Sequence, residues 1–430
     1  MLLCSSVAEA RGPDAAVAHA QGKDVTQVGT DPNSASTSNQ EPAPASPSPA
    51  PLEADDGKFK FGGAIRARYD VRYDASSLAG FPKTSEHFSF DTLALKASYD
   101  SSTIFGAAQY RFYGGSFVYG PRNGYLGYPG EVSFPLYAYL GYKFTPEDSL
   151  TVGINQVPFS LLSTFSVSFF ETIGFTMGLE EVYNFGVKYA HVGKDLNYQF
   201  GFYPGASPNA VGISLDSARY STNIVRADPG LTNGSQNREQ NMFVGRVEYF
   251  PIKNGSNSFG FGASVWHSDI YNFDTGLTGA KQLEGVHFIA TNGPWGLKGN
   301  YIRQDIDLKN PNGNAIISIG GYDSSYNMAT HGNFVSAELT YKFTDPVGLF
   351  TPAPYVNYSA FFKDKSNFKT SERFMVGSAW TYVNDPNLII YTEYMIGRND
   401  AYVGSFSQGL AAGGDDRWKS RFYMNIGYYF

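Results

Sequence analysis

Closely spaced arginines stand near the start of the structured part of the chain, in the stretch FKFGGAIRARYDVRY from Phe59 to Tyr73. Side chains alternate between the two faces of an extended strand. One face then carries the polar set Lys60, Arg66, Arg68, Asp70 and Arg72, and the other the apolar set Phe59, Phe61, Ile65, Tyr69 and Val71. A guanidinium stays charged and offers five N–H donors, so a row of them attracts anions and does no proton-transfer chemistry.

The same alternation places further bases on the polar faces of later strands. The full candidate set is Lys60, Arg66, Arg68, Arg72, Lys96, Arg111, Lys143, Lys188, Arg246, Arg373 and Arg421. Acids on these faces are fewer, namely Asp70, Glu248, Glu338 and Glu393. If the polar faces surround a lumen, a surplus of one sign biases which ions enter it. The alternative is that these bases pair with the neighbouring acids or lie near the mouth.

Catalytic and metal-binding chemistry finds little support. The only cysteine is Cys4, so the remainder of the chain can form no disulfide and no cysteine metal site. No G-x-S-x-G occurs, and no histidine lies in a recognisable hydrolase motif. The loops DLKNPNGN and GGDD could bind calcium, but solvated turns explain them better. We therefore expect no enzyme activity, no cofactor and no metal site.

The polar faces belong to long alternating runs that begin after Gly57. Seven connections between runs are short and rich in Pro, Gly, Asn and Asp, which supply turn geometry. Aromatic residues precede most of them, as an interfacial girdle would require. Eight connections are long, at about 74–86, 115–131, 158–181, 204–239, 271–279, 307–330, 363–370 and 399–417.

Seven short and eight long connections join sixteen strands. The chain is only 17% charged and 16% aromatic, with 47 glycines, and it has no apolar stretch long enough for a membrane helix. This combination predicts an all-β fold, a sixteen-stranded antiparallel transmembrane β-barrel over residues 58–430. A large soluble sandwich or propeller is the rival, but it would not need aromatics beside its short turns.

The third long connection, residues 158–181, is named the constriction loop. It is apolar and serine-rich, with Glu171, Glu180 and Glu181 as its only charges. Such a segment is poorly suited to water and would find packing partners inside a barrel. We expect Phe159, Phe165, Phe169, Phe170 and Glu171 to narrow the lumen, with Glu171 facing the basic wall. The alternative is packing at a subunit interface.

The chain ends carry their own signals. Residues 1–20 look like the remnant of an export signal, with Ala18-His19-Ala20 in the form of a cleavage site. Residues 21–57 are rich in Pro, Ala, Ser and acid, which predicts a disordered periplasmic segment. At the other end, RFYMNIGYYF alternates up to Phe430 and reads as the strand that closes the barrel against residues 58–73.

The body of the chain resembles Gram-negative outer-membrane porins. The resemblance rests on the terminal Phe430, on Val157-Pro158-Phe159 followed by a long loop, and on GLEEVYNFGVKY from Gly178 to Tyr189. The last two features are similar to the phosphate-selective type and its wider relatives. The resemblance implies a homotrimer of sixteen-stranded pores and recognition of Phe430 by the barrel assembly machinery. Phosphate selectivity does not follow, because the constriction loop has no Arg or Lys.

These observations predict a bacterial outer-membrane porin that conducts small hydrophilic solutes and prefers anions. Its partners would be outer-membrane lipid, these solutes and copies of itself, and not nucleic acid. The first alternative is a porin for sugars or other nutrients, which could stack on the inward tyrosines Tyr137, Tyr139, Tyr391, Tyr423 and Tyr429. The alternative from another class is a barrel enzyme or adhesin with a plugged lumen.

Overall fold

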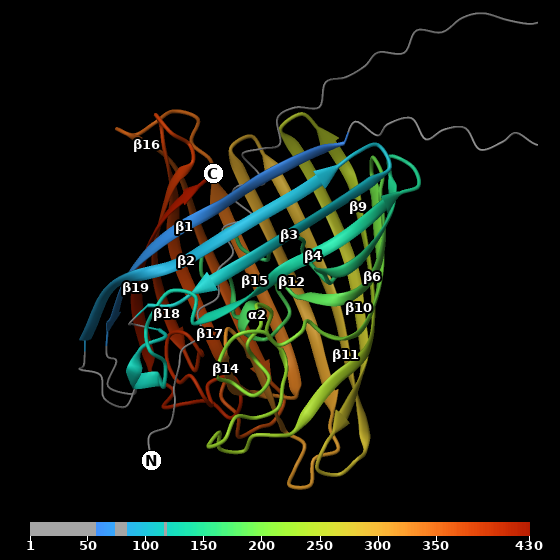
Figure 1. The fold of residues 1–430 in the computed structure, drawn as a ribbon, viewed down its shortest axis with the longest axis vertical. Coiled ribbons are helices and arrows are strands. Elements are labelled where there is room, and N and C mark those ends of the chain that lie inside the picture. Colours follow the sequence, from blue (N-terminus) through green and yellow to red (C-terminus); the bar gives the residue numbers. More distant parts are fainter. Residues whose placement is uncertain (1–56, 74–83, 116–117) are drawn as a thin grey trace, which may run out of the picture.

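A closed antiparallel barrel dominates the computed structural model, which describes residues 57–73, 84–115 and 118–430 (Figure 1). The expected signal remnant at 1–20 and nearly all of the expected segment at 21–57 lie outside the described residues. The barrel strands are β1 (Lys58–Tyr73), β2 (Thr84–Asp100), β3 (Ile104–Tyr113), β4 (Val132–Lys143), β5 (Asp148–Gln156), β6 (Tyr183–Val192), β7 (Leu196–Ala206), β9 (Asn237–Asn254), β10 (Asn257–Asn272), β11 (Thr278–Asn292), β12 (Trp295–Asp307), β15 (His331–Tyr341), β16 (Phe350–Lys363), β17 (Ser371–Tyr382), β18 (Leu388–Arg398) and β19 (Trp418–Tyr429).

These sixteen strands confirm the predicted count within the described part of the chain. Strands adjacent in the barrel are joined alternately by short turns and long connections, as the sequence indicates. All seven short turns lie at one end, here named the short-turn end, and the other is the long-loop end. No helix among the described residues is long and apolar enough to cross a membrane.

The outer surface of the barrel is apolar, as a membrane-spanning barrel requires. Large side chains point outward from many strands, with Phe61 at 81% exposure and Leu140 at 69%. Exposed aromatics next to the short turns include Phe144, Tyr249 and Phe343, which fits the predicted girdle. A charge at the midplane of this surface would cost about 2–4 kcal/mol, so polar residues are driven inward.

Two β-bulges correct the simple alternation. The β3–β4 register shifts after Gln109, and Leu136 is only 1% exposed, although strict alternation with the outward Leu140 predicts that it faces lipid. The β1–β2 register shifts between Arg66 and Ala67, where Arg66 pairs with Thr92 and Ala67 with Phe90. The residue between the two partners, Asp91, is buried although strict alternation would point it outward. An extra residue in one strand resets which face the following side chains occupy.

The first and last strands close the barrel as expected. β1 pairs with β19 from Ala64↔Tyr429 to Tyr73↔Ser420. At the short-turn end, the backbone N–H of Gly63 donates to the carbonyl of Phe430 at 2.7 Å, and Phe430 N–H donates back at 3.0 Å. The terminal residue therefore completes the ladder rather than fraying.

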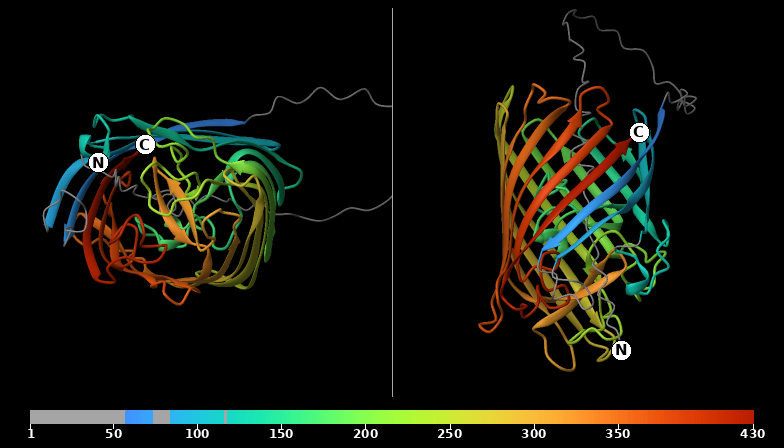
Figure 2. Two further views of the ribbon diagram at one scale, coloured as in Figure 1. Left: turned by 90° about the horizontal axis from the view of Figure 1, so that it is seen from below. Right: turned by 90° about the vertical axis from the view of Figure 1, so that its left-hand side faces the viewer.

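A second sheet lies within the long loops and was not predicted. It contains β8 (Asn223–Ile224), β13 (Ile316–Gly321) and β14 (Ser324–Ala329) in the order β14-β13-β8. All residues of β14 are buried. Figure 2 shows, from the long-loop end, that these loops fold into the ring of strands. Two short helical turns, η2 (Pro121–Asn123) and α2 (Ile173–Thr176), lie in the second and third long connections.

Candidate functional site

Arginines from three strands gather on one side of the lumen. They are named the arginine wall and comprise Arg66, Arg68 and Arg72 of β1, Arg111 of β3 and Arg421 of β19. Closure of the barrel produces this cluster, because β19 pairs with β1 and puts Arg421 directly opposite Arg72. Arg66, Arg68, Arg111 and Arg421 are each at most 2% exposed. The neighbourhood expected for Arg421 is therefore confirmed.

Two carboxylates are embedded in the arginine wall. Asp70 accepts from Arg68 Nε at 2.5 Å and from Arg421 Nε at 2.9 Å, and thus bridges the two end strands. Asp91 lies 3.5 Å from Arg66 Nε and 3.6 Å from Arg68 Nη1. Sequence reasoning missed Asp91, because only the bulge in β2 turns it inward. The described wall thus formally combines five guanidinium groups with two carboxylates.

The other predicted pore-lining bases have different surroundings. Lys60 is exposed and Lys96 is half-buried. Lys143 lies at the short-turn end, where it donates to Asp100 at 2.6 Å. Lys188 donates to the carbonyl of Gln156 at 2.9 Å. These four lysines are not part of the arginine wall.

Arg246 of β9 and Arg373 of β17 lie outside the arginine wall. Arg246 pairs with Glu248 at 2.6 Å, and His287 lies 3.2 Å from the same carboxylate oxygen. Arg373 binds Asp400 through two hydrogen bonds of 2.5 and 2.8 Å. The alternative of pairing with acids therefore holds for these two arginines, as it does for Arg66, Arg68 and Arg421.

The constriction loop runs inside the barrel, as the sequence predicts. All four residues of its short helix α2, labelled in Figure 1, are buried. Phe159, Phe165, Phe169, Phe170 and Glu171 are all at most 2% exposed. Phe159 packs against Trp266 of β10 with ring centroids 5.8 Å apart, and Phe165 against Phe334 of β15 at 6.0 Å. Burial of these rings in the lumen explains why so apolar a loop is stable here.

Two inward glutamates bind backbone N–H groups of this loop. Glu393 of β18 accepts from Phe169 N–H at 2.5 Å and from Phe170 N–H at 3.3 Å. Glu338 of β15 accepts from Val167 N–H at 3.0 Å. Charge-assisted bonds of this kind are roughly twice as strong as neutral ones. The acids that alternation placed inward therefore hold the loop.

Basic and polar side chains bind the same loop from neighbouring strands. Arg246 Nε donates to the carbonyl of Ser160 at 2.6 Å, and Arg373 Nη1 to that of Phe170 at 3.2 Å. Further bonds come from Ser264, Lys298, Asn300, Asn357 and Ser359. These side chains, with Glu338 and Glu393, are named the docking wall. They lie on strands β9 to β18, whereas the arginine wall lies on β1, β3 and β19.

The tip of the loop reaches from the docking wall to the arginine wall. The guanidinium carbon of Arg66 lies 5.6 Å from the ring centroid of Phe169, and that of Arg421 lies 4.7 Å from Phe170. Tyr423 of β19 stacks edge-on against Phe170 at 4.4 Å and lies under Arg68 at 5.1 Å. Cation–π contacts of this type favour the charged, desolvated arginine.

Glu171 differs in part from expectation. It lies in the loop tip, fully buried, with a left-handed φ of 54°. Within the described residues, neither of its carboxylate oxygens has a hydrogen-bond partner. Instead, its backbone carbonyl accepts from Arg373 of the docking wall at 3.3 Å. The predicted pairing of Glu171 with the basic wall therefore stays a prediction.

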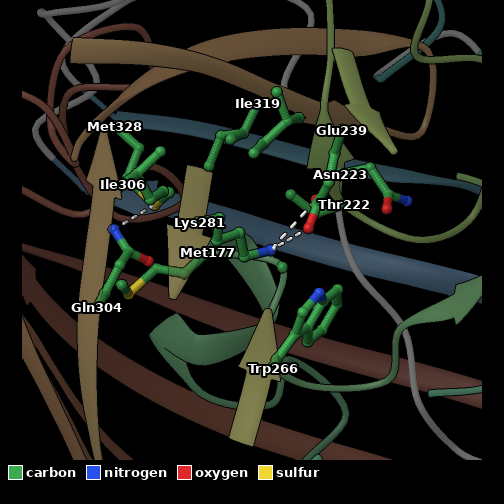
Figure 3. A pocket seen from close by; sticks show the side chains of 12 residues that line it. Met177, Thr222, Asn223, Glu239, Trp266, Lys281, Gln304, Ile306, Ile319 and Met328 are labelled. Carbon is green, nitrogen blue, oxygen red and sulfur yellow. Dashed lines mark hydrogen bonds and ion pairs between the residues drawn. The ribbon is translucent and has the colours of Figure 1, made fainter. Parts of the chain in front are cut away.

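Packing between the loops and the barrel wall is tight beyond the tip. A cavity of about 10 Å³, the space of one water, lies between the constriction loop, the second sheet and the barrel wall. Figure 3 shows the side chains that line it. Lys281 Nζ donates to Glu239 at 3.0 Å there and lies 3.9 Å from the ring centroid of Trp266. Met177 and Met328 fill the opposite side. The ion pair is thus satisfied, and the cavity is too small for a solute.

Comparison with known proteins identifies the architecture. No protein-family model and no curated sequence matches the chain. Among solved structures, the anion-selective porin from Comamonas acidovorans shares 12% identity, with a TM-score of 0.55 over 87% of this chain and 100% of that one. The outer membrane channel DcaP of Acinetobacter baumannii shares 13%, with a TM-score of 0.57 over 87% and 97% of the two chains. Salmonella typhi OmpF, in complex with daunomycin, shares 10%, with a TM-score of 0.53 over 88% and 99%.

The fold is that of an outer-membrane porin. Together with the apolar outer surface, this fold identifies a transmembrane barrel of the bacterial outer membrane. In porin folds the short turns are periplasmic and the long loops extracellular, so the second sheet lies on the extracellular side. None of these three structures is named as a phosphate-selective porin, and the finer resemblance to that type stays a prediction.

Proposed function

We propose that the chain is a porin through which small hydrophilic solutes diffuse passively, with a preference for anions. The solute path would run through the lumen beside the point where the tip of the constriction loop meets the arginine wall. A fixed surplus of positive charge in a low-dielectric lumen concentrates anions and repels cations. The protein would act without catalysis, cofactor or metal.

The observation that carries this proposal is the division of charge between the two walls. On the docking wall, Glu338 and Glu393 are occupied with loop N–H groups, while Arg246 and Arg373 are paired with Glu248 and Asp400. Among the described residues, the arginine wall holds five guanidinium groups and two carboxylates, with Asp91 within ion-pair distance of Arg66 and Asp70 bonded to Arg421. The positive surplus is therefore concentrated on one side of the proposed path.

A nutrient-specific porin is the second candidate. Tyr137 and Tyr139 of β4 lie side by side with ring centroids 5.9 Å apart, and both remain half-buried. Tyr391 and Tyr423 are instead covered by Phe169, and Tyr429 is 7% exposed. The β4 pair could stack against a sugar ring, which favours a neutral solute at that level of the pore.

Assembly is part of the same proposal. Trimeric forms occur among structures of similar fold, including OmpT of Vibrio cholerae, with a TM-score of 0.51 to this chain. We propose a homotrimer whose folding begins with recognition of Phe430 by the barrel assembly machinery.

The alternative to a porin is a barrel enzyme or adhesin whose lumen is plugged.

Conductance across a planar bilayer separates these readings. The purified protein should conduct, and its reversal potential in a KCl gradient should indicate chloride preference. Replacing Arg66 and Arg68 by Ala should shift the reversal potential toward that of a cation-selective pore, because both guanidinium groups belong to the arginine wall. A matched control is Arg303→Ala with Arg398→Ala, which removes two arginines of the outer face. If the folded protein carries no current, the porin function is rejected and a barrel enzyme or adhesin with a plugged lumen remains.

A further inference from the structure

Two arginines meet at one aromatic ring on the outer surface, at the extracellular end of β9 and β10. The guanidinium carbon of Arg226 lies 3.7 Å from the ring centroid of Phe273, and that of Arg238 lies 5.3 Å from it. Arg226 comes from the loop before β9 and Arg238 from the start of β9. Both side chains are exposed. They are named the rim arginine pair.

The register shows that these side chains face away from the lumen. The backbone of Arg226 forms a β-bridge with Gln236, and the carbonyl of Gln236 accepts from Phe273 N–H at 2.9 Å. In the β9–β10 ladder, Arg238 is the backbone partner of Tyr271. The residues on either side of Arg238 along β9, Asn237 and Glu239, are at most 2% exposed and point inward. Since neighbours alternate, Arg226, Arg238 and Phe273 share the outer face.

The pair lies at the height of the lipid headgroups. Val265, at 51% exposure, is the last large apolar side chain on the outer face of β10 before the exposed His267, and Phe243 of β9, at 57%, is the partner of His267. Arg238 and its ladder partner Tyr271 lie beyond His267, toward the extracellular end. With a rise of about 3.4 Å per residue and a strand tilt of about 40°, the distance from His267 to Tyr271 along the barrel axis is roughly 10 Å. Headgroups fill this layer above the hydrocarbon.

No carboxylate balances the two charges in the part of the chain that the structure describes. Neither guanidinium lies within ion-pair distance of an acid, and Arg238 makes only a 3.3 Å bond to Gln240. The nearest acid in contact, Asp216, accepts from the backbone N–H of Arg226 at 3.2 Å, while its side chain pairs with Arg219. Two cations held at one ring without a counter-charge form a site for an external anion.

We propose that the rim arginine pair binds the phosphate group of a phosphorylated lipid in the outer leaflet. Guanidinium groups bind phosphate through paired N–H donors, and Phe273 holds both in position while its face offers apolar contact to the lipid. The site is separate from the pore and does not depend on what the pore conducts. A phosphate dissolved in water has the same chemistry, but the outward orientation at headgroup height favours the lipid.

The test is native mass spectrometry of the full chain purified in detergent, with lipid A as the probe. Wild-type protein should retain bisphosphorylated lipid A, and Arg226→Gln with Arg238→Gln should reduce retention about tenfold or more. The variant with Arg226→Lys and Arg238→Lys should retain an intermediate amount of lipid A, because it keeps both positive charges and loses the paired N–H donors. Arg417→Gln, which removes an exposed arginine of the last loop, should retain as much as wild type.

Two further measurements on wild-type protein do not depend on the folding of a variant. Dephosphorylated lipid A should bind wild-type protein about as weakly as lipid A binds the variant with Arg226→Gln and Arg238→Gln. Equal binding of lipid A and dephosphorylated lipid A to wild-type protein would overturn the proposal. Inorganic phosphate at millimolar concentration should leave lipid A bound. Complete displacement by inorganic phosphate would assign the site to the free ion and reject the lipid. Unchanged retention in the double glutamine variant would also reject it.

Discussion

Asp70 is the residue on which the arginine wall depends most directly. It accepts from Arg68 on its own strand and from Arg421 across the closing seam, and all three side chains are buried. A single buried carboxylate thus positions two guanidinium groups at fixed spacing. It also reduces the positive potential that the proposed path would present to an anion.

Asp70→Asn should therefore have two opposite effects. Loss of the negative charge should move the reversal potential further toward chloride, because the arginines remain. Loss of a charged acceptor should lower the free energy of unfolding by about 1–3 kcal/mol. Bilayer recordings and urea unfolding followed by gel mobility measure the two effects.

The matched control for this change lies on the outer face. Asp305 pairs with Arg303, two residues away on the same strand, and Arg68 and Asp70 have the same spacing. Unlike that buried pair, Asp305 and Arg303 are partly exposed. Asp305→Asn should leave ion selectivity unchanged. If Asp70→Asn also leaves it unchanged, the arginine wall does not border the ion path.

At the scale of elements, the constriction loop is held by acids that do not belong to it. Glu338 and Glu393 accept from its backbone, and Tyr355 also donates to Glu393 at 2.6 Å. Replacing both glutamates by Gln keeps the size and removes the charge of the acceptors. The loop should then move more, and single-channel current should become larger and noisier.

Glu372→Gln is the control for the loop prediction. Glu372 is bonded to Arg398 and Tyr358 and precedes the inward Arg373, so it lies on the outer face. The single-channel current of the Glu372→Gln variant should equal that of wild type. A quiet, unchanged current in the double glutamine variant would show that apolar packing alone holds the loop.

The second sheet carries a pH-sensitive contact on the extracellular side. Asp323, between β13 and β14, accepts from the N–H groups of Ile213 and Ser214, each at 2.8 Å, and from Tyr125 at 2.8 Å. Burial, with a smaller contribution from nearby Asp228, raises the pKa of Asp323 despite these bonds. A raised pKa means that the docked loop binds the proton more tightly than the free loop does.

Docking of the 213–214 segment should therefore be strongest below the ordinary aspartate pKa and weaken as the pH rises through the raised pKa. Hydrogen exchange of the Ile213 and Ser214 amides, corrected for the intrinsic pH effect, should show more protection at pH 4 than at pH 7. Asp323→Asn keeps an acceptor and should abolish the difference. A difference that persists in this variant would assign the pH effect to another group.

Strand positions could be predicted because their signals are local, and much of the site could not. Turn residues and alternation located the sixteen strands and the inward Glu338 and Glu393. The bulge that buries Asp91 has no such signal, since one extra residue in a ladder leaves composition unchanged. The strands β13 and β14 are six residues each, and β8, which pairs with β13, lies far back in the chain. Which loop amide a glutamate binds depends on this tertiary packing.

At the scale of the whole molecule, the proposed path exists only when the two ends of the chain meet. Arg72 and Arg421 are 349 positions apart and become direct partners in the β1–β19 ladder. Asp70 then bridges the seam. An open sheet would separate these charges and expose two unpaired edges to lipid, which is why closure and the arginine wall form together.

Gly63 is the point at which this seam tolerates least change. A β-carbon at Gly63 would come within 2.4 Å of the carbonyl oxygen of Ala94 and 2.8 Å of the ring of Phe430. Gly63→Ala should therefore lower the yield of closed barrel, seen as loss of the heat-modifiable band after refolding in detergent. Gly245→Ala is the control, because its β-carbon would meet only side chains at 3.5 Å or more. Deletion of Phe430 should lower the yield in the same way, since it removes both backbone bonds to Gly63. Wild-type yields from both seam variants would show that the barrel closes without the Gly63–Phe430 contact, and the arginine wall would then need no help from the chain terminus.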